Sequence, residues 1–428
     1  MTKVTLPYGK DEVNFEIDEK SYIGKMRPPI AQKCGNPETI IEEAINNPIG
    51  SKKLDEIIIP GKKIAIIIDD ISRPTPIKTI LTILLKKLDS LKVQDSDILI
   101  VIALGSHRYM TEKEIEERVG TEIFTRYKII NSEFKKKERL VYVSTTKDGV
   151  NLIGTKEVVE ADIKIGLGNL VPHPVMGWGG GGKILYPGIA SEETVAYFHL
   201  IASLYSENMF GQETTPIRDM METWVDAIGL DFIINVVLTS KMELAGCVAG
   251  NYIKAHRQGV EKGKKVLGVP IKEKADVIVV SSFPADQDFW QSPKALYGAE
   301  AELKGTEGGT MILLSPNFEG VGPHPEFLDY MGHDTGDQIV KNYIKGIPTS
   351  GDPLAIAVGN SMSKMRKRRD LVVVSDGVTK EEMDICGCKY YPLSELQKAV
   401  DEALQKKKNS RLAAIANGAE IFLYEEKK

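Results

Sequence analysis

The sequence has few cysteines, few aromatic residues and no long apolar runs. Its 428 residues include four cysteines, Cys34, Cys247, Cys386 and Cys388, too few and too scattered for a disulfide framework. The last two have C-x-C spacing and no second pair, so they do not indicate a zinc site. No apolar run approaches the roughly 18 residues that cross a bilayer, and the start, MTKVTLPYGKDEV, lacks a signal-peptide core. These absences predict a cytoplasmic protein without membrane contacts.

An excess of positive charge is also missing. The chain carries 55 lysines and arginines against 60 acidic residues, a formal net charge of −5. Three basic runs, at 134–139, 364–370 and 405–411, are interpreted as solvated helix faces or turns. Nucleic-acid binding would need interleaved aromatic residues or a known module, and neither is present. We therefore expect no nucleic-acid partner.

Short apolar segments rich in valine and isoleucine recur along the chain, as is typical of strands buried on both faces. Helical patterns lie between them, for instance at 76–91 and 111–120. This alternation predicts an α/β fold with mainly parallel sheets and helices on both faces. The strand candidates are 62–69, 97–104, 161–168, 231–238, 275–282, 309–315, 352–358 and 370–376.

A break in the pattern near 268–274 divides the chain. We expect an N-terminal domain at 1–268 and a C-terminal α/β domain at 274–399, since this length is enough for two or three domains. The tail, 400–428, contains a helix and a final strand. It could return to either domain, and we assign it to the N-terminal one.

The stretch GWGGGGKILYPG, residues 177–188, fits the start of a phosphate-binding P-loop, G-x-x-x-x-G-K. Two requirements fail. Ile184 stands where a serine or threonine would hold Mg²⁺, and Tyr186-Pro187-Gly188 follows where a helix should begin. A nucleotide hydrolase is therefore disfavoured, and Lys183 needs another role.

Polar side chains follow three of the predicted strands. The first strand leads into Asp69, Asp70 and Arg73. The second is followed by His107 and the third by His173. The carboxyl ends of parallel strands face the crevice in which α/β sheets bind ligands. The sequence thus predicts one shared site.

Other candidates are ambiguous on their own. His199 lies in a helical stretch, and reads either as a half-buried histidine or as a metal ligand. No motif completes a metal site, so remaining ligands would have to come from outside the protein. Gln291 and Lys294 share a helical face and, with Arg73, suit a carboxylate. Lys294 alone could equally be an exposed helix lysine.

Taken together, the motifs resemble, in order and spacing, those of the nickel-pincer nucleotide-dependent lactate racemase family. They are DDISRPTP, LGSHR, PHPVMGWGGGGKILYPGIASEETVAYFH and DQDFWQSPKAL, within residues 69–296. The resemblance implies a 2-hydroxy acid racemase or epimerase, with lactate as the default substrate and the site between two domains. A larger 2-hydroxy acid is one alternative. A non-catalytic protein that binds the cofactor or a hydroxy acid is another.

The resemblance also implies the cofactor and its contacts. Nickel would be held by pyridinium-3,5-bisthiocarboxylic acid mononucleotide, the nickel-pincer nucleotide, tethered to Lys183 as a thioamide. His199 would be the protein ligand of the metal. Cofactor-synthesis and loading enzymes would then be partners. Further cofactor contacts are expected from Asp70, Arg73, Thr75, Trp178, Gly179, Gly180, Gly181 and Gly182, although Trp178 could equally fill a core.

The expected chemistry is hydride transfer through a planar 2-keto acid, which avoids a carbanion beside the carboxylate. His107 and His173 would serve as the two bases, one for each enantiomer. Asp70 would orient a base or Arg73. The acid itself would be held by Arg73, Gln291, Lys294 and Trp290.

Overall fold

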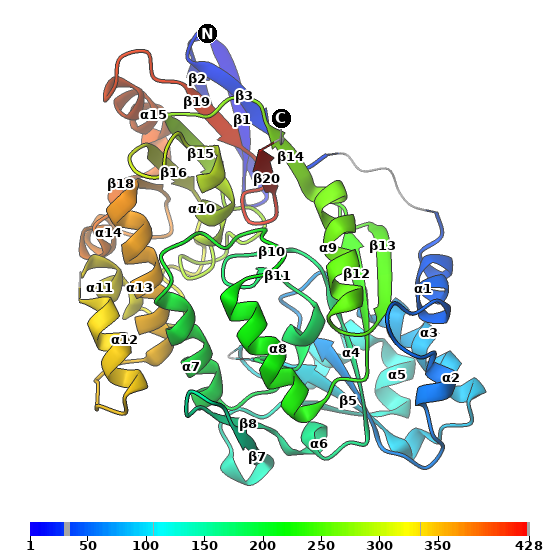
Figure 1. The fold of residues 1–428 in the computed structure, drawn as a ribbon. Helices are drawn as coiled ribbons and strands as arrows, with labels where there is room; N and C mark the ends of the chain where they lie inside the picture. The colour runs from blue at the N-terminus through cyan, green and yellow to red at the C-terminus, as the bar shows by residue number, and fades with distance from the viewer. Residues whose placement is uncertain (30–34, 106, 334, 426–428) are drawn as a thin grey trace.

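The computed structural model describes residues 1–29, 35–105, 107–333 and 335–425. Two six-stranded sheets form the centres of two domains (Figure 1). The predicted class, α/β with mainly parallel sheets, is confirmed. Cys34 lies outside the described residues, and Cys247, Cys386 and Cys388 are buried free thiols. Within the described residues, no helix combines the length and apolar character needed to cross a membrane.

The first sheet has the strand order β13-β12-β9-β4-β5-β6 and is parallel except for β13. Four predicted strands are confirmed as its central members. The strands are β4 (Ile64–Asp69), β5 (Ile98–Ala103), β6 (Lys128–Asn131), β9 (Ile163–Asn169), β12 (Phe232–Leu238) and β13 (Leu244–Gly250).

Helices cover both faces of this sheet because successive residues of a strand point to opposite sides. In β4, Ile64, Ile66 and Ile68 join one core and Ala65 and Ile67 the other. On the first face lie α1 (Pro37–Asn46), α3 (Ile77–Ser90), α4 (Glu112–Val119) and α5 (Thr121–Arg126), with the short α2 (Leu54–Ile57) beside them. On the second lie α7 (Glu192–Ser203), α8 (Pro216–Ile228) and α9 (Lys254–Leu267), with α6 (Lys156–Val159) near the paired strands β7 (Leu140–Thr145) and β8 (Asn151–Thr155).

The second sheet is wholly parallel, with the order β18-β17-β16-β15-β19-β3. Its strands are β3 (Tyr22–Met26), β15 (Val277–Ser281), β16 (Thr310–Leu314), β17 (Asp370–Val374), β18 (Lys389–Tyr391) and β19 (Leu412–Ile415). One face is covered by α10 (Lys294–Ala299), α11 (Phe327–Gly332), α13 (Pro353–Arg368) and α14 (Lys380–Cys386), with α12 (Gly336–Ile344) beside α13. The other is covered by α15 (Leu396–Gln405) and the hairpin of β1 (Thr2–Tyr8) and β2 (Asp11–Ile17).

The strand predicted at 352–358 is wrong, because this segment opens the helix α13. Asp352 caps the helix by accepting a hydrogen bond from Leu354 N at 2.8 Å, and Pro353 occupies its first turn. The run looks like a strand because the first turns of α13 are buried against α7 and α11. A short apolar run bounded by turn residues does not distinguish a buried strand from a buried helix.

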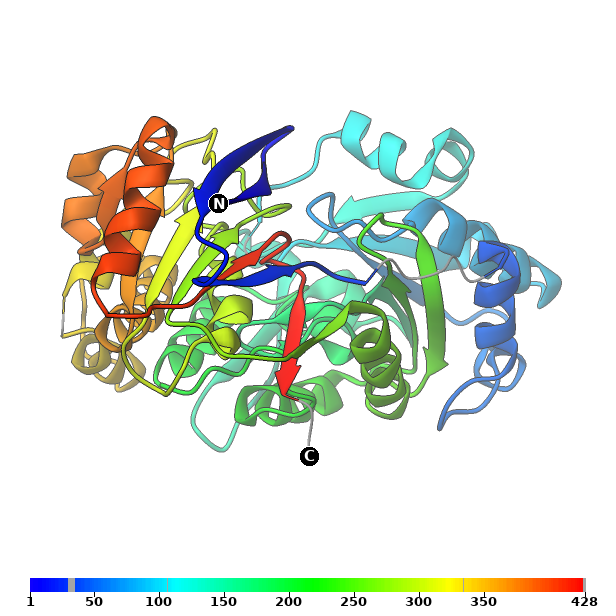
Figure 2. The same cartoon turned by 90° about the horizontal axis from the view of Figure 1, so that it is seen from above.

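The domain limits expected at the chain ends need correction. In the tail, β19 pairs with β15 inside the second sheet, and β3 from the N-terminus pairs with β19 (Figure 2). The final strand, β20 (Phe422–Glu425), pairs with β14 (Gly268–Ile271), the link between the domains. Both chain ends therefore complete the second domain. The strand β19 is only four residues long and alanine-rich, so its sequence gave little strand signal.

One helix ties the domains together beside the site. The helix α7 comes from the N-terminal half but packs against α12 and α13 of the second domain. At its end, the backbone oxygen of Ser203 accepts hydrogen bonds from Lys364 Nζ at 2.6 Å and Asn360 Nδ2 at 3.1 Å. The position of α7, which carries His199, is thus fixed by both domains.

Candidate active site

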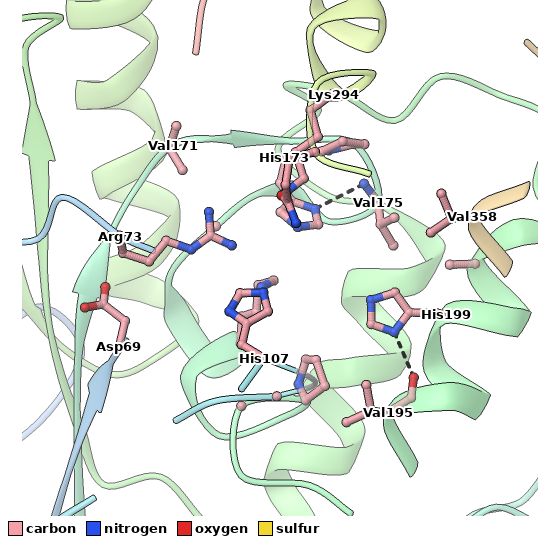
Figure 3. Close-up of a pocket in the computed structure, with 18 of the residues that line it drawn as sticks. Asp69, Arg73, His107, Val171, His173, Val175, Val195, His199, Lys294 and Val358 are labelled. Carbon is pink, nitrogen blue, oxygen red and sulfur yellow. Dashed lines mark hydrogen bonds between the residues drawn. The ribbon is translucent and has the colours of Figure 1, made fainter. Parts of the chain in front are cut away.

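A cavity of about 240 Å³ lies between the two domains, at the carboxyl ends of β4, β5 and β9. Most of the residues predicted for the site line it, and in Figure 3 the imidazoles of His107, His173 and His199 gather with Arg73 and Lys294 around one space. From the first domain these residues are Asp69, Asp70, Arg73, His107, His173, Gly179, Gly180, Lys183 and His199; from the second they are Trp290, Gln291 and Lys294.

Asp70 and His107 form a carboxylate–imidazole pair. Asp70 Oδ2 lies 2.5 Å from His107 Nδ1, and the other carboxylate oxygen accepts hydrogen bonds from Ser72 N at 2.9 Å and Ser72 Oγ at 2.5 Å. Burial opposes ionisation of Asp70, but the bonds from His107 and Ser72 outweigh it and hold its pKa well below the usual range. An ionised carboxylate only accepts, so His107 donates from Nδ1 and turns Nε2 away from Asp70. Asp70 therefore forms a hydrogen bond with His107 and not with the guanidinium of Arg73.

Asp69, the neighbour of Asp70, has a different set of partners. Its carboxylate forms an ion pair with the largely buried Arg118 and accepts a hydrogen bond from Thr75 Oγ1 at 2.5 Å. Arg118 Nε also donates to the backbone oxygen of Asp69 at 2.8 Å. Thr75 is buried and does not line the cavity, so its expected cofactor contact is not supported. These residues fix the loop that follows β4.

The glycine-rich loop folds tightly against the protein beneath it. Gly180 and Gly181 have φ of 72° and 62°, which favours glycine, and Gly181 N donates to Asn235 Oδ1 at 2.7 Å. A Cβ on Gly181 would lie 2.9 Å from His256, and one on Gly182 2.9 Å from Val225. Gly181 and Gly182 do not line the cavity, so packing against the core explains them better than contact with a cofactor.

Trp178, expected either at the cofactor or in a core, lies in the core. It is fully buried, and its Nε1 donates to the backbone oxygen of Gly211 at 2.9 Å. Its ring meets the edge of Phe422 in β20 at 5.6 Å between centroids, and it does not line the cavity.

Lys183 follows the glycines in a short 3₁₀ turn and extends into the cavity. Burial, together with the positive charges of Arg73, Lys294 and Arg218, lowers its pKa to about 7. Among the described residues, its ammonium group has no hydrogen-bond or ion-pair partner. An unpaired amine that is partly neutral at physiological pH is suited to act as a nucleophile.

His199 is held by its own helix. Its Nδ1 lies 2.8 Å from the backbone oxygen of Val195, one turn earlier in α7, and Figure 3 shows this bond. Burial lowers its pKa to about 4, and Lys183 and other nearby cations add to the effect. The ring is thus neutral, with its proton on Nδ1 and the Nε2 lone pair free for a metal. Across the described residues, no cluster of three or more His, Cys, Asp or Glu side chains could hold a metal unaided.

His173 stands at the start of a tight turn. The short strands β10 (Pro172–His173) and β11 (Gly177–Trp178) pair, and the chain reverses between them. The backbone N–H groups of Val175 and Met176 donate to His173 Nδ1 at 3.1 and 3.2 Å. Burial, and then the positive charges of Lys183, Arg73 and Lys294, lower the pKa of His173 well below its usual value.

The second domain contributes a cation and an aromatic wall. Lys294 Nζ donates to Gln291 Oε1, and burial together with the charge of Arg73 lowers the pKa of Lys294 to about 7. In the described part of the chain, the guanidinium of Arg73 has no hydrogen-bond or ion-pair partner. Trp290 lies against the ring of His324, with 4.5 Å between centroids. The cationic groups of Arg73 and Lys294 can receive a carboxylate.

Sequence reasoning missed the wall that α13 supplies. Leu354, Ala357, Val358, Ser361 and Met362 line the cavity from this helix. The pair Asp352-Pro353, which is typical of a helix start, was the signal that could have identified a helix here and hence these residues.

Fold and cavity together describe a two-domain α/β protein with a histidine-rich cavity between its domains. Residues 8–211 match the family model "Lactate racemase N-terminal domain", and residues 271–423 match "Lactate racemase C-terminal domain". The chain belongs to the lactate racemase family, and is accordingly an isomerase of the racemase type.

Individual relatives agree with this assignment. The chain is 33% identical over 330 residues to the lactate racemase of Lactiplantibacillus plantarum, covering 75% of this chain and 76% of that protein. It is 31% identical over 331 residues to that of Thermoanaerobacterium thermosaccharolyticum, with the same coverage. The lactate racemase apoprotein structure from T. thermosaccharolyticum matches with a TM-score of 0.85 and 26% identity, covering 99% of this chain and all of that one. A Thermotoga maritima protein, at 19% identity and a TM-score of 0.69 over 93% of this chain and all of that one, shares the fold.

Proposed function

We propose that this protein racemises a 2-hydroxy acid, with lactate as the first substrate to test, and uses a nickel-pincer nucleotide tethered to Lys183. The observation that carries the proposal is one cavity that gathers an unpaired buried lysine, three histidines and two cations between the domains. The names of the relatives support the choice of lactate.

The residues present fit such a cofactor. Lys183 offers an amine without a protein partner for a covalent link, and His199 offers an Nε2 lone pair whose direction is fixed through Val195. One imidazole is too few ligands for nickel, and the described residues supply no complete set. An organic group that brings its own donor atoms accounts for this shortage. When bound, the cofactor would accept the hydride from C2 of the acid and return it.

The chain's own residues then bind and orient the acid. Arg73 and Lys294 would hold its carboxylate, since a guanidinium presents a planar fork and an ammonium a point charge. Gln291 would orient Lys294 through their hydrogen bond. As the hydride leaves C2, His107, oriented by Asp70, would take the hydroxyl proton, and the loss of both leaves a planar 2-keto acid. His173 would serve the oxygen from its own side.

The wall from α13 and Trp290 would shield the reacting atoms from water. Leu354, Val358 and Met362 make this wall largely apolar. It therefore suits the side chain on C2, which is the part of the substrate that differs among 2-hydroxy acids. A larger acid than lactate therefore remains the second candidate.

The test is racemisation by protein co-expressed with the cofactor-making and loading enzymes. L-lactate, 2-hydroxybutyrate and phenyllactate would be incubated separately, and the enantiomers separated by chiral chromatography. We expect one of the three to approach a racemic mixture, and His107→Ala protein to lose most of this activity. Nickel-loaded protein that binds these acids without interconverting their enantiomers would instead favour a non-catalytic binding role.

A further inference from the structure

The two histidines expected to exchange the substrate proton have opposite partners at Nδ1. His107 Nδ1 lies 2.5 Å from Asp70 Oδ2, an atom that accepts only, so His107 carries its proton on Nδ1. His173 Nδ1 receives the backbone N–H groups of Val175 and Met176, which donate only. Figure 3 shows the bond from Val175 to this ring, and a neutral His173 therefore carries its proton on Nε2.

We infer that the two histidines are not interchangeable in the free protein: His107 presents a proton acceptor at Nε2, whereas His173 presents a hydrogen-bond donor at Nε2. In the state that the structure describes, His173 donates to an oxygen of the bound acid, and the hydroxyl proton leaves to His107. This inference rests on the proposed function for the identity of the ligand. It goes beyond that function by assigning the two rings different tautomers and different first roles.

Protonation of His173 conflicts with its surroundings. An imidazolium would direct Nδ1–H at two backbone N–H groups, leaving three donors facing one another without an acceptor. Burial and the charges of Lys183, Arg73 and Lys294 oppose the same form, and hold the pKa of His173 well below its usual value. At His107, in contrast, the Nδ1 proton points at an acceptor, the carboxylate of Asp70.

The turn that positions His173 is anchored by hydrogen bonds from Thr215 and Arg218. Arg218 Nε donates to Met176 O at 3.1 Å, and Thr215 Oγ1 donates to Val175 O at 3.4 Å. Arg218 also donates to Trp178 O, and it is fully buried. Val175 O and Met176 N–H belong to one peptide plane, so the bond from Thr215 helps to hold this N–H on His173, and the bonds from Arg218 fix the peptides that follow. For His173 to accept a proton, this turn must release Nδ1, and Val175 of the same turn lines the cavity.

The first test reads the tautomers directly in cofactor-free protein. Protein labelled with ¹⁵N-histidine would be examined at neutral pH by long-range ¹H–¹⁵N correlation, with His107→Gln and His173→Gln identifying the two rings. We expect a protonated Nδ1 in His107 and a protonated Nε2 in His173. The same tautomer in both rings, or an imidazolium at His173, would overturn the inference. Because no turnover is needed, this failure is distinguishable from absent racemisation, which would contradict the proposed function instead.

The second test measures affinity for oxamate, a stable analogue of a 2-keto acid, by calorimetry. Glutamine can place an amide N–H near the position of imidazole Nε2–H but cannot take up a proton. We expect His173→Gln to bind within about 3-fold of the unaltered protein and His173→Ala about 10-fold more weakly, which is the loss of one hydrogen bond. His333→Gln, on an exposed side chain away from the cavity, is the matched control. Equal affinity in the alanine variant, or equal losses in both variants, would contradict a donor role.

Discussion

The Nδ1 atom of His199 lies 2.8 Å from the backbone oxygen of Val195, its neighbour one helical turn earlier. A carbonyl oxygen only accepts, so the proton of the neutral ring is on Nδ1 and the lone pair is on Nε2. In metal-binding histidines, a hydrogen bond of this kind commonly fixes both the tautomer and the ring orientation. The helix α7 thus fixes the tautomer and orientation of His199 without a second side chain.

We predict that His199→Ala separates metal binding from cofactor attachment. If His199 is the protein ligand of nickel, the variant should lose most of its nickel while Lys183 keeps a covalent adduct. Metal analysis and intact mass on the same co-expressed sample measure both quantities. His333→Ala should retain nickel and adduct alike. Full nickel content in the His199 variant would remove His199 from the metal site.

Lys183 should react as an amine at unusually low pH. Burial and neighbouring cations lower its pKa to about 7, against an ordinary lysine value near 10.4, so raising the pH through 7 should deprotonate it. The rate of acylation of cofactor-free protein, followed by peptide mass spectrometry, should therefore reach half its maximum near pH 7. Lys294, whose pKa is also lowered to about 7, must be resolved as a separate peptide.

The exposed Lys113 in the same digest provides a reference for the reagent. Lys183→Met should abolish labelling at this position and also the cofactor adduct in co-expressed protein. A rate at Lys183 that keeps rising up to pH 10 would show that its amine is not activated by its surroundings.

Replacing Asp69 should mainly lower the unfolding free energy, whereas replacing its neighbour Asp70 should mainly lower kcat. Asp70→Asn removes the carboxylate that orients His107, and should lower kcat by about 10²- to 10⁴-fold with little change in unfolding free energy. Asp69→Asn breaks a buried ion pair with Arg118 and should destabilise the fold by about 3 kcal/mol. Urea denaturation and racemisation rates of both variants test the contrast. Similar effects on stability would contradict the separate roles.

Much of the site could be predicted because it depends on topology. Asp70, His107 and His173 each follow a buried strand, and parallel strands bring their carboxyl ends to one edge of the sheet. Lys183 and His199 were predictable only through the family resemblance. Composition and spacing alone left His199 between a packed histidine and a metal ligand.

The remaining differences arise where the local sequence pattern does not determine the position of a residue. Thr75 lies in a recognisable motif, yet its bond to Asp69 takes it away from the cavity, and Trp178 occupies the core position that was one of its two alternatives. The α13 wall was missed because an apolar run of seven residues fits a strand as well as a helix. The tail was misassigned because strand pairing between 22–26 and 412–415 is set by tertiary contacts and not by local pattern.

Trp178 provides a last prediction, which separates packing from cofactor contact. Its ring is fully buried against Phe422 and above Gly263, where an added Cβ would lie 2.6 Å from the indole. Trp178→Ala should destabilise the protein by about 3–5 kcal/mol through the cavity it leaves. Trp178→Phe keeps an aromatic ring but loses the bond to Gly211, and should cost about 1–2 kcal/mol. Urea denaturation measures both, and intact mass should show a normal adduct at Lys183 in the phenylalanine variant. A stable, folded Trp178→Phe protein without the adduct would mean that the indole contacts the cofactor after all.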